Sequence, residues 1–169
     1  MPRTIHGDLR GDGLRVVVLV SLWNRPVTDR LRSGALEVLR AAGVADADIT
    51  VVEVPGAFEL PQAAAVVANE NLIDAVVALG CLVKGETDHD RIIADACAKG
   101  LTDVSLFSKL PVTFGVITAN TQAEADARSR DGAGKGKGGH KGREAAEAAV
   151  RLASALRRYG EDRVEGDAS

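Results

Sequence analysis

A dense group of polar residues stands directly after an apolar run near the middle of the chain. Residues 74–79 (DAVVAL) have the composition of a buried strand, and residues 80–90 (GCLVKGETDHD) follow them. Histidine titrates near neutral pH and can move protons between amines, carbonyls and water, so His89 is the candidate general acid or base. A lone histidine in the first turn of a helix is more often a surface residue. The residues alone leave both interpretations open.

The same stretch offers a second kind of chemistry, the binding of an anion. Gly85, Glu86 and Thr87 lead into a predicted helix. The first backbone N–H groups of a helix lack partners and favour negative charge, so a phosphate group could bind there. The competing interpretation is a cap without a ligand, in which Thr87 or Asp88 accepts those hydrogen bonds.

Aromatic residues make up only 3% of the chain, and two of them follow predicted strands. Trp23 and Asn24 come after the strand expected at residues 14–22, and residues 55–59 (PGAFE) follow the strand expected at residues 49–54. Ligands of open α/β sheets bind beyond the carboxyl ends of the strands, so Trp23 and Phe58 could stack on a planar ligand. Alternatively, both rings seal the top of the core.

Other motifs carry weaker signals. Residues 131–142 (DGAGKGKGGHKG) contain GxGxxG, but the run follows a helix instead of a strand. This context predicts a mobile basic loop and not a dinucleotide site. Cys81 and Cys97 lack the spacing of a zinc site or a disulfide framework, so we interpret them as reduced core thiols. His6 and His140 are assigned no role.

The elements that position these residues alternate between strands and helices. Four apolar, β-branched runs predict strands at residues 14–22, 49–54, 74–79 and 111–118. Apolar residues at helical spacing predict helices, the first with Thr28 as its N-cap, at residues 31–42, 62–69, 89–99, 121–128 and 143–158. Right-handed crossovers then give a three-layer α/β/α sandwich with a four-stranded parallel sheet. We expect residues 159–169 to be a flexible polar tail.

The composition narrows the class of protein. A chain of 169 residues with 46% hydrophobic and 27% charged residues is typical of one globular domain, which we place at residues 1–158. A net charge of −3 does not favour a nucleic-acid-binding protein. The first fifteen residues are charged and lack the apolar run of a signal peptide or membrane span. We therefore expect a cytoplasmic protein without membrane contact.

Three segments resemble the lumazine synthase family of riboflavin biosynthesis, at residues 54–61 (VPGAFELP), 80–89 (GCLVKGETDH) and 98–105 (AKGLTDVS). Weaker similarity at residues 21–28 (SLWNRPVT) and 111–118 (PVTFGVIT) and at Lys141-Gly142 extends the resemblance over residues 5–158. The family condenses 5-amino-6-(D-ribitylamino)uracil with 3,4-dihydroxy-2-butanone 4-phosphate to 6,7-dimethyl-8-ribityllumazine, losing phosphate and water. The resemblance implies a transferase for this penultimate step of riboflavin biosynthesis, with no metal or organic cofactor.

The resemblance also implies roles for individual residues. His89 stands at the family's proton-transfer position. The residues matched to contacts with the pyrimidine and ribityl chain are Trp23, Ala57, Phe58, Glu59, Cys81, Leu82, Val83 and Phe114. The residues matched to the phosphate are Glu86, Thr87 and Arg128, with Arg130 as the alternative to Arg128.

The position of Phe114 implies an oligomer. Phe114 lies near the start of its predicted strand, away from the carboxyl edge of the sheet, so it can reach a site only from another subunit. The family forms homopentamers with active sites between subunits, and some members pack further into decamers or icosahedral shells. Residues 5–15 resemble the family's amino-terminal strand, which pairs with a neighbouring subunit.

The chain departs from the family pattern in three places. Asp88 adds a negative charge beside the expected phosphate site, and Trp23 replaces the usual phenylalanine. The loop between Arg128 and Lys141 is longer than in shell-forming members, which favours a free pentamer. Two rival functions stay open. One is an archaeal-type riboflavin synthase, which needs no butanone phosphate site, and the other is a flavin-binding or shell-forming protein without catalysis.

Overall fold

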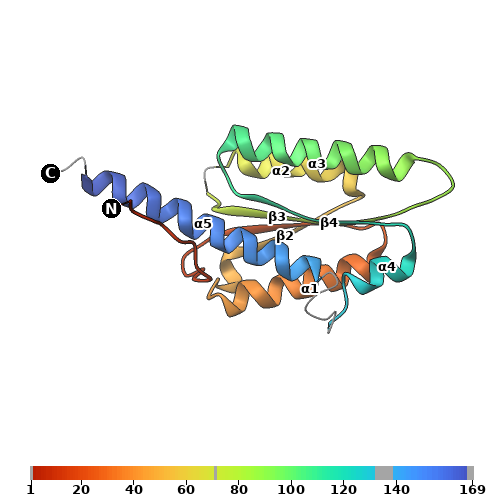
Figure 1. Ribbon diagram of the computed structural model, residues 1–169, viewed down its shortest axis with the longest axis horizontal. Helices are drawn as coiled ribbons and strands as arrows, with labels where there is room; N and C mark the ends of the chain where they lie inside the picture. Colours follow the sequence, from red (N-terminus) through yellow and green to blue (C-terminus); the bar gives the residue numbers. More distant parts are fainter. Residues whose placement is uncertain (1, 71, 132–138, 167–169) are drawn as a thin grey trace.

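The computed structural model describes residues 2–70, 72–131 and 139–166 and has three layers (Figure 1). The middle layer is a parallel sheet in the order β2-β1-β3-β4, formed by β1 (Val16–Ser21), β2 (Ile49–Val54), β3 (Ala75–Val83) and β4 (Val112–Ala119). One face is covered by α1 (Arg25–Ala41), α4 (Gln122–Ala127) and α5 (Lys141–Gly166), and the other by α2 (Leu60–Ala68) and α3 (His89–Ser108). The predicted three-layer fold with a four-stranded parallel sheet is confirmed.

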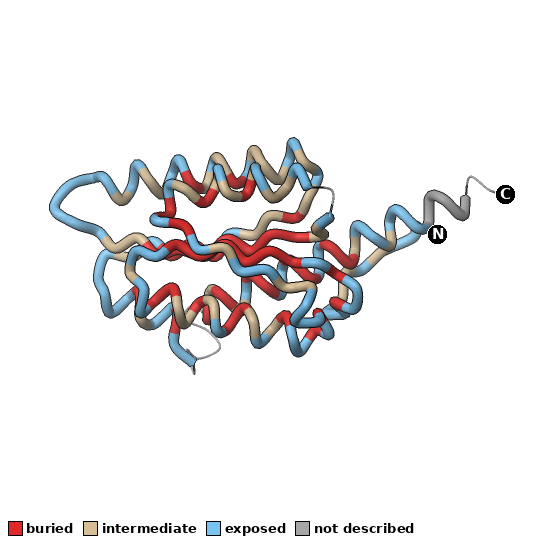
Figure 2. The backbone as a smooth tube through the Cα atoms, turned by 180° about the vertical axis from the view of Figure 1, so that it is seen from behind, coloured by how far each residue is buried: buried red, intermediate tan, exposed pale blue. Residues whose placement is uncertain are grey.

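The alternating side chains of β1 build a core on each face of the sheet. Val16, Val18 and Val20 belong to the cluster shared with α1 and α5, whereas Val17 and Leu19 belong to the cluster shared with α2 and α3. All five are buried, and the sheet is the most deeply covered layer in Figure 2. A strand covered on both faces needs apolar side chains at every position, which explains the continuous β-branched run.

The strands part at the carboxyl end of the sheet. β1 pairs with β3 only as far as Val20 and Leu79, but it pairs with β2 one residue further, through Ser21 and Val54. The Leu22 N–H then donates to the Val54 carbonyl at 2.9 Å. Because β2 lies on one side of β1 and β3 on the other, the crevice between β1 and β3 is the topological switch point of the sheet.

The start of α1 differs from the prediction. We expected Thr28 to cap the helix, but α1 begins at Arg25 and Thr28 is buried inside it. Asn24 occupies the cap position with a left-handed backbone, at φ 57° and ψ 44°. Pro26 follows in the first turn, where its fixed φ suits a helix and its missing N–H costs nothing.

The end of α3 also differs from the prediction. Gly100 is a common type of residue for a helix end, so we expected α3 to stop at Lys99, but it continues to Ser108. A Cβ atom on Gly100 would lie 2.7 Å from the Cβ of Pro61. The glycine therefore permits the close approach of α2 to α3 and does not end the helix.

Two further elements are longer than predicted. β3 continues past Leu79, its predicted end, to Val83, because its pairing with β4 extends that far. α5 begins at Lys141 and continues beyond Arg158, where we expected the helix to end, to Gly166.

The connection before α5 is only partly described. The predicted basic loop falls mostly on residues 132–138, which lie outside the described residues. On either side of them, the Lys141 N–H donates to the Arg128 carbonyl at 2.9 Å, which joins the end of α4 to the start of α5. His140, to which the sequence assigned no role, is buried against α1, and its Nδ1 accepts the Arg143 N–H at 3.3 Å. Burial, followed by the Arg143 charge, lowers the pKa of His140.

The amino-terminal segment, residues 2–15, forms no strand within the chain and lies beside the carboxyl-terminal half of α5 (Figure 1). The Asp8 N–H donates to the Ser154 hydroxyl at 2.9 Å, and Arg158 binds the Asp8 carboxylate. Hydrogen bonds from Arg10 and Arg158 hold the pKa of Asp8 well below its usual range. Pairing of this segment with a neighbouring subunit stays a prediction.

Candidate active site

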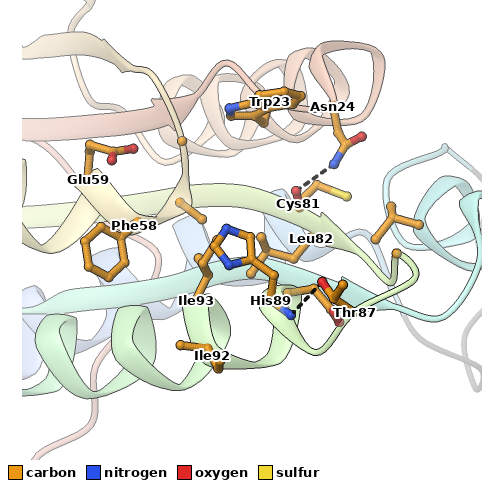
Figure 3. A pocket seen from close by; sticks show the side chains of 15 residues that line it. Trp23, Asn24, Phe58, Glu59, Cys81, Leu82, Thr87, His89, Ile92 and Ile93 are labelled. Carbon is orange, nitrogen blue, oxygen red and sulfur yellow. Dashed lines mark hydrogen bonds between the residues drawn. The ribbon is translucent and has the colours of Figure 1, made fainter.

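A surface cavity of about 620 Å³ lies over the carboxyl ends of β1, β2 and β3. Its walls are the turns after β1 and β2, the end of β3, and the loop that leads into α3 (Figure 3). The structure brings together nine of the predicted site residues, namely Trp23, Ala57, Phe58, Glu59, Cys81, Leu82, Val83, Thr87 and His89. These residues come from three separate segments because parallel strands end at the same edge of the sheet.

The two aromatic side chains after the strands border this cavity and are exposed. The exposed fraction is 68% for Trp23 and 60% for Phe58, so the alternative in which both seal the core is wrong. Trp23 and Glu59 both lie against Gly56. A Cβ atom on Gly56 would be 3.0 Å from Glu59 Oε2 and 3.2 Å from Trp23 Cδ1. The absence of a side chain at Gly56 therefore lets the indole and the carboxylate share one wall.

The structure adds cavity residues that the predicted set lacked. Asn24 lines the cavity beside Trp23, and its Nδ2 donates to the Cys81 carbonyl at 2.9 Å. Ile92 and Ile93 add an apolar surface from α3. A sequence signal for the isoleucines was available, because they lie three and four residues after His89, which places them on the same side of a helix.

The amino terminus of α3 faces the cavity, and its first backbone N–H groups have no carbonyl partner within the helix. The first intrahelical bond runs from the Ile92 N–H to the Asp88 carbonyl, so the three preceding N–H groups lie outside the helix ladder. Thr87 Oγ1 accepts one of them, from His89, over a long 3.4 Å, whereas the Asp88 side chain forms no cap hydrogen bond. Thr87 therefore caps one N–H group weakly, and the Asp88 side chain caps none. The start of α3 retains N–H donors that can bind an anion.

Three predicted site residues lie away from this cavity. Glu86 is exposed and does not line it. Phe114 pairs in register with Ala78, four residues before Leu82, which corresponds to about 13 Å along the strand. Phe114 instead lines two smaller surface cavities, one beside α3 and one beside α5. Arg128 is exposed at the end of α4.

The two candidate phosphate arginines differ in their partners. Arg130 Nη2 forms an ion pair with Asp126 at 3.1 Å, and Arg30 of α1 binds the same carboxylate. Burial raises the pKa of Asp126, but hydrogen bonds from Gln122 and Arg30 outweigh it, so the pKa lies below its usual value. Among the described residues, the Arg128 guanidinium has neither an ion pair nor a hydrogen bond. Arg128 is therefore the freer of the two to bind a phosphate.

The two cysteines are buried thiols with raised pKa values. Both are free and buried, which confirms the prediction of reduced core thiols. Burial raises the pKa of Cys81 and of Cys97 to about 11, so each thiol is protonated at neutral pH and is a poor nucleophile. Within the described part of the chain, no group of three or more His, Cys, Asp or Glu side chains could hold a metal ion.

Comparison with known proteins connects this geometry to a family. Residues 13–157 match the model of the 6,7-dimethyl-8-ribityllumazine synthase family. The chain belongs to the lumazine synthase family. This membership confirms the resemblance inferred from the three sequence segments.

Curated relatives with the name 6,7-dimethyl-8-ribityllumazine synthase match the chain over most of its length. The protein of Thermotoga petrophila is 37% identical over 99% of this chain and 98% of its own length. The proteins of Aquifex aeolicus and Xanthomonas campestris pv. campestris are each 42% identical, over 88% and 89% of this chain and 94% and 95% of their own lengths. Lumazine synthases are transferase-type enzymes that form lumazine by a condensation, the penultimate step of riboflavin biosynthesis.

Proposed function

We propose that this chain condenses 5-amino-6-(D-ribitylamino)uracil with 3,4-dihydroxy-2-butanone 4-phosphate to form 6,7-dimethyl-8-ribityllumazine. The observation that carries this proposal is the cavity at the carboxyl edge of the sheet. Residues from three family-like segments meet there, and its volume of about 620 Å³ lies in the range of small-molecule sites.

One side of the cavity suits the flat, polyhydroxylated substrate. The exposed indole of Trp23 offers a stacking surface for the pyrimidine, and Phe58 borders the same cavity from the turn after β2. The carboxylate of Glu59 accepts hydrogen bonds and suits the ribityl hydroxyls. The segment from Cys81 to Val83 borders the same space and can read the ring edge through its backbone groups.

The other side suits the phosphate. The amino terminus of α3, with Thr87 and the neighbouring Glu86, supplies backbone N–H groups and a helix dipole. Arg128, whose guanidinium has no partner among the described residues, would complete this site from a neighbouring subunit. Bidentate hydrogen bonds from an arginine hold a phosphate both while the substrate binds and as the phosphate leaves.

The mechanism follows from this arrangement. The ring amine attacks the ketone and loses water to form an imine, and phosphate is then eliminated to leave an enol that becomes a second carbonyl. The ribitylamino nitrogen adds to this carbonyl, whose oxygen leaves as a second water, and so closes the second ring. His89, in the first turn of α3, faces the cavity between the pyrimidine and phosphate sides and would move protons in these steps (Figure 3). Holding two substrates in register can supply roughly 7 to 11 kcal/mol of the barrier reduction.

The complete site requires more than one chain, and we propose a homopentamer. Phe114, on the edge strand β4, is 46% exposed and lies too far along the strand to reach the cavity of its own chain. Leu106 and Phe107 on α3 are 72% and 88% exposed, and exposed apolar surface of this kind marks interfaces. Light scattering should give the mass of five 17.6-kDa chains, whereas a monomer would contradict the proposal. A higher mass would indicate a decamer or a shell.

We also place the enzyme in the cytoplasm. Both cysteines are free thiols, as is usual in a reducing compartment. In the described part of the chain, no helix has the length and apolar character that crossing a membrane requires. Cell fractionation followed by detection of the chain tests this placement.

The decisive experiment is a turnover assay with both substrates and the purified, assembled protein, in which absorbance follows lumazine formation. Saturable product formation above the uncatalysed background supports the proposal. No rate above background from a folded oligomer would overturn it. Riboflavin binding without turnover would then favour a non-catalytic flavin-binding protein.

A further inference from the structure

Asn24 has two features that its place at the start of α1 does not explain. Its backbone is left-handed, at φ 57°, a conformation that most side chains disfavour. It occupies the N-cap position, yet its side chain forms no cap hydrogen bond. The side chain instead crosses the crevice to β3, where Nδ2 donates to the Cys81 carbonyl at 2.9 Å (Figure 3).

The Cys81 carbonyl lies on the side of β3 that faces β1, beyond the point where the pairing of these two strands ends. β1 stops pairing with β3 two residues before Cys81. The N–H groups of Val76 and Lys84 point towards β4, where each donates a hydrogen bond. Backbone groups alternate between the two sides of a strand, so Cys81 and Val83 direct theirs into the crevice. The Asn24 carboxamide thus takes the place of a β1 donor for the Cys81 carbonyl. The backbone N–H and carbonyl of Val83 stay available to a ligand.

The same residue sets the position of the indole. Two fixed points enclose this turn: the hydrogen bond from the Leu22 N–H to β2, and the start of α1 at Arg25. Only Trp23 and Asn24 lie between them. The carbonyl of Asn24 accepts the first two N–H groups of the α1 ladder, at 2.8 and 3.1 Å, which fixes its peptide. The left-handed turn therefore decides the direction in which Trp23 leaves the backbone, over Gly56 and towards the cavity.

We propose that Asn24 is a positioning residue that holds both walls of the pyrimidine end of the cavity, the Trp23 ring and the backbone from Cys81 to Val83. This inference rests on the proposed function, because it names the residue that sets the spacing of that substrate's site. Asparagine suits both tasks, since it tolerates the left-handed conformation and its carboxamide supplies a donor. Glycine has the conformation without the donor, and an ionised aspartate can only accept hydrogen bonds.

Substitutions separate the two tasks. Asn24→Gly keeps the left-handed turn and removes the donor, Asn24→Ala disfavours the turn as well, and Asn24→Asp sets a carboxylate against the Cys81 carbonyl. The loss of one hydrogen bond should raise the KM for 5-amino-6-(D-ribitylamino)uracil about threefold to tenfold in Asn24→Gly. The increase should be larger in the other two variants. In Asn24→Gly, kcat should fall less than KM rises, and the KM for the butanone phosphate should not change.

The matched control is Asn69→Gly, at the exposed carboxyl end of α2 on the opposite edge of the sheet. This variant should keep the wild-type values of both KM and kcat. If Asn24→Ala fails to fold, Asn24→Gly alone decides, because glycine is accepted at helix N-caps and in left-handed turns. A wild-type KM in Asn24→Gly would overturn the inference.

A second readout needs no substrate. Trp23 is the only tryptophan in the chain, so its fluorescence reports on this turn alone. Loss of the Asn24 carboxamide should lower the fluorescence anisotropy and increase acrylamide quenching in the folded, assembled variant. If the wild-type enzyme is active and the Asn24 variants keep its fluorescence and KM, the inference is overturned and the proposed function is unaffected. An inactive wild type would sink the proposed function, and the fluorescence would still decide whether Asn24 positions Trp23.

Discussion

A methyl group added at Gly56 should damage the site and leave the fold intact. Gly56 has an extended backbone, at φ −148° and ψ 179°, which alanine adopts without strain. The added Cβ would lie 3.0 Å from Glu59 Oε2 and 3.2 Å from Trp23 Cδ1. Both neighbours are side chains that border the cavity, so the side chains must move while the backbone can stay in place.

The displacement follows from ordinary contact distances. Because ordinary contacts of a Cβ atom begin at about 3.4 Å, the Trp23 ring must shift by at least about 0.2 Å and the Glu59 carboxylate by at least about 0.4 Å. Productive geometry requires that catalytic and binding groups are held to within about 0.5 Å, and a misplacement of 1 Å can cost about 100-fold in rate. Shifts close to this limit should therefore lower kcat/KM about fivefold to twentyfold. The free energy of unfolding should be unchanged or higher by up to about 1 kcal/mol, because alanine restricts the unfolded chain.

Steady-state kinetics with each substrate and unfolding in urea test this prediction together. Gly160→Ala is the matched control, because a Cβ there meets no atom within 4 Å and the position lies on an exposed part of α5. The control should keep wild-type activity. A Gly56→Ala enzyme with wild-type kcat/KM would refute the reasoning. Loss of activity with a matching loss of stability would also refute it, because the damage would then be to the fold.

Four further predictions concern single groups. His89→Ala should lower the single-turnover rate about 100-fold or more while pyrimidine binding, measured by titration, stays intact; an unchanged rate would remove His89 from the mechanism. Asp88→Asn should lower the KM for the butanone phosphate about twofold to fivefold, and an unchanged KM would show that this charge does not reach the phosphate. The depressed pKa of Asp8 means that its carboxylate stabilises the docked residues 2–15 above its unfolded pKa of about 4, and that this contribution is lost as the pH falls further. Hydrogen exchange of the segment, corrected for intrinsic rates, should therefore accelerate below that pH in the wild type, and an Asp8→Asn variant should already exchange fast at neutral pH. Among the described residues, the buried Ser21 hydroxyl has no hydrogen-bond partner, so Ser21→Ala should leave the urea midpoint unchanged or raise stability by up to about 1 kcal/mol; a clear loss would reveal a partner.

The order of strands and helices could be predicted because it depends on local patterns. The β-branched run of β1 needs no partner in the sequence to be identified as a buried strand. The bounds of β2 and the start of α3 were also predicted correctly. Other boundaries depend on contacts between distant residues, and the predicted ends of α3 and β3 were wrong. Gly100 resembles a helix end until Pro61 is seen packed against it, and Leu79 resembles a strand end until β4 is seen alongside the four residues that follow.

The candidate site could be predicted where it depends on strand ends. Trp23, Phe58 and the stretch before His89 each follow a different parallel strand, and parallel strands place these positions at one edge. The role that we propose for Asn24 could not be predicted in this way, because it depends on a backbone angle and on a carbonyl 57 residues away. Arg128 shows the opposite limit, since the resemblance of the sequence to the family assigns it to the phosphate, but within this chain it does not line the cavity.

The separation of Phe114 and Arg128 from the cavity has a genetic consequence. If a neighbouring chain supplies both residues, His89→Ala and Arg128→Ala damage different halves of each composite site. Two inactive variants that are unfolded and reassembled as an equal mixture should then regain activity, because chance pairing leaves about a quarter of the sites with both halves intact. A cell that carries the two alleles would grow without added riboflavin, although neither allele alone would allow it.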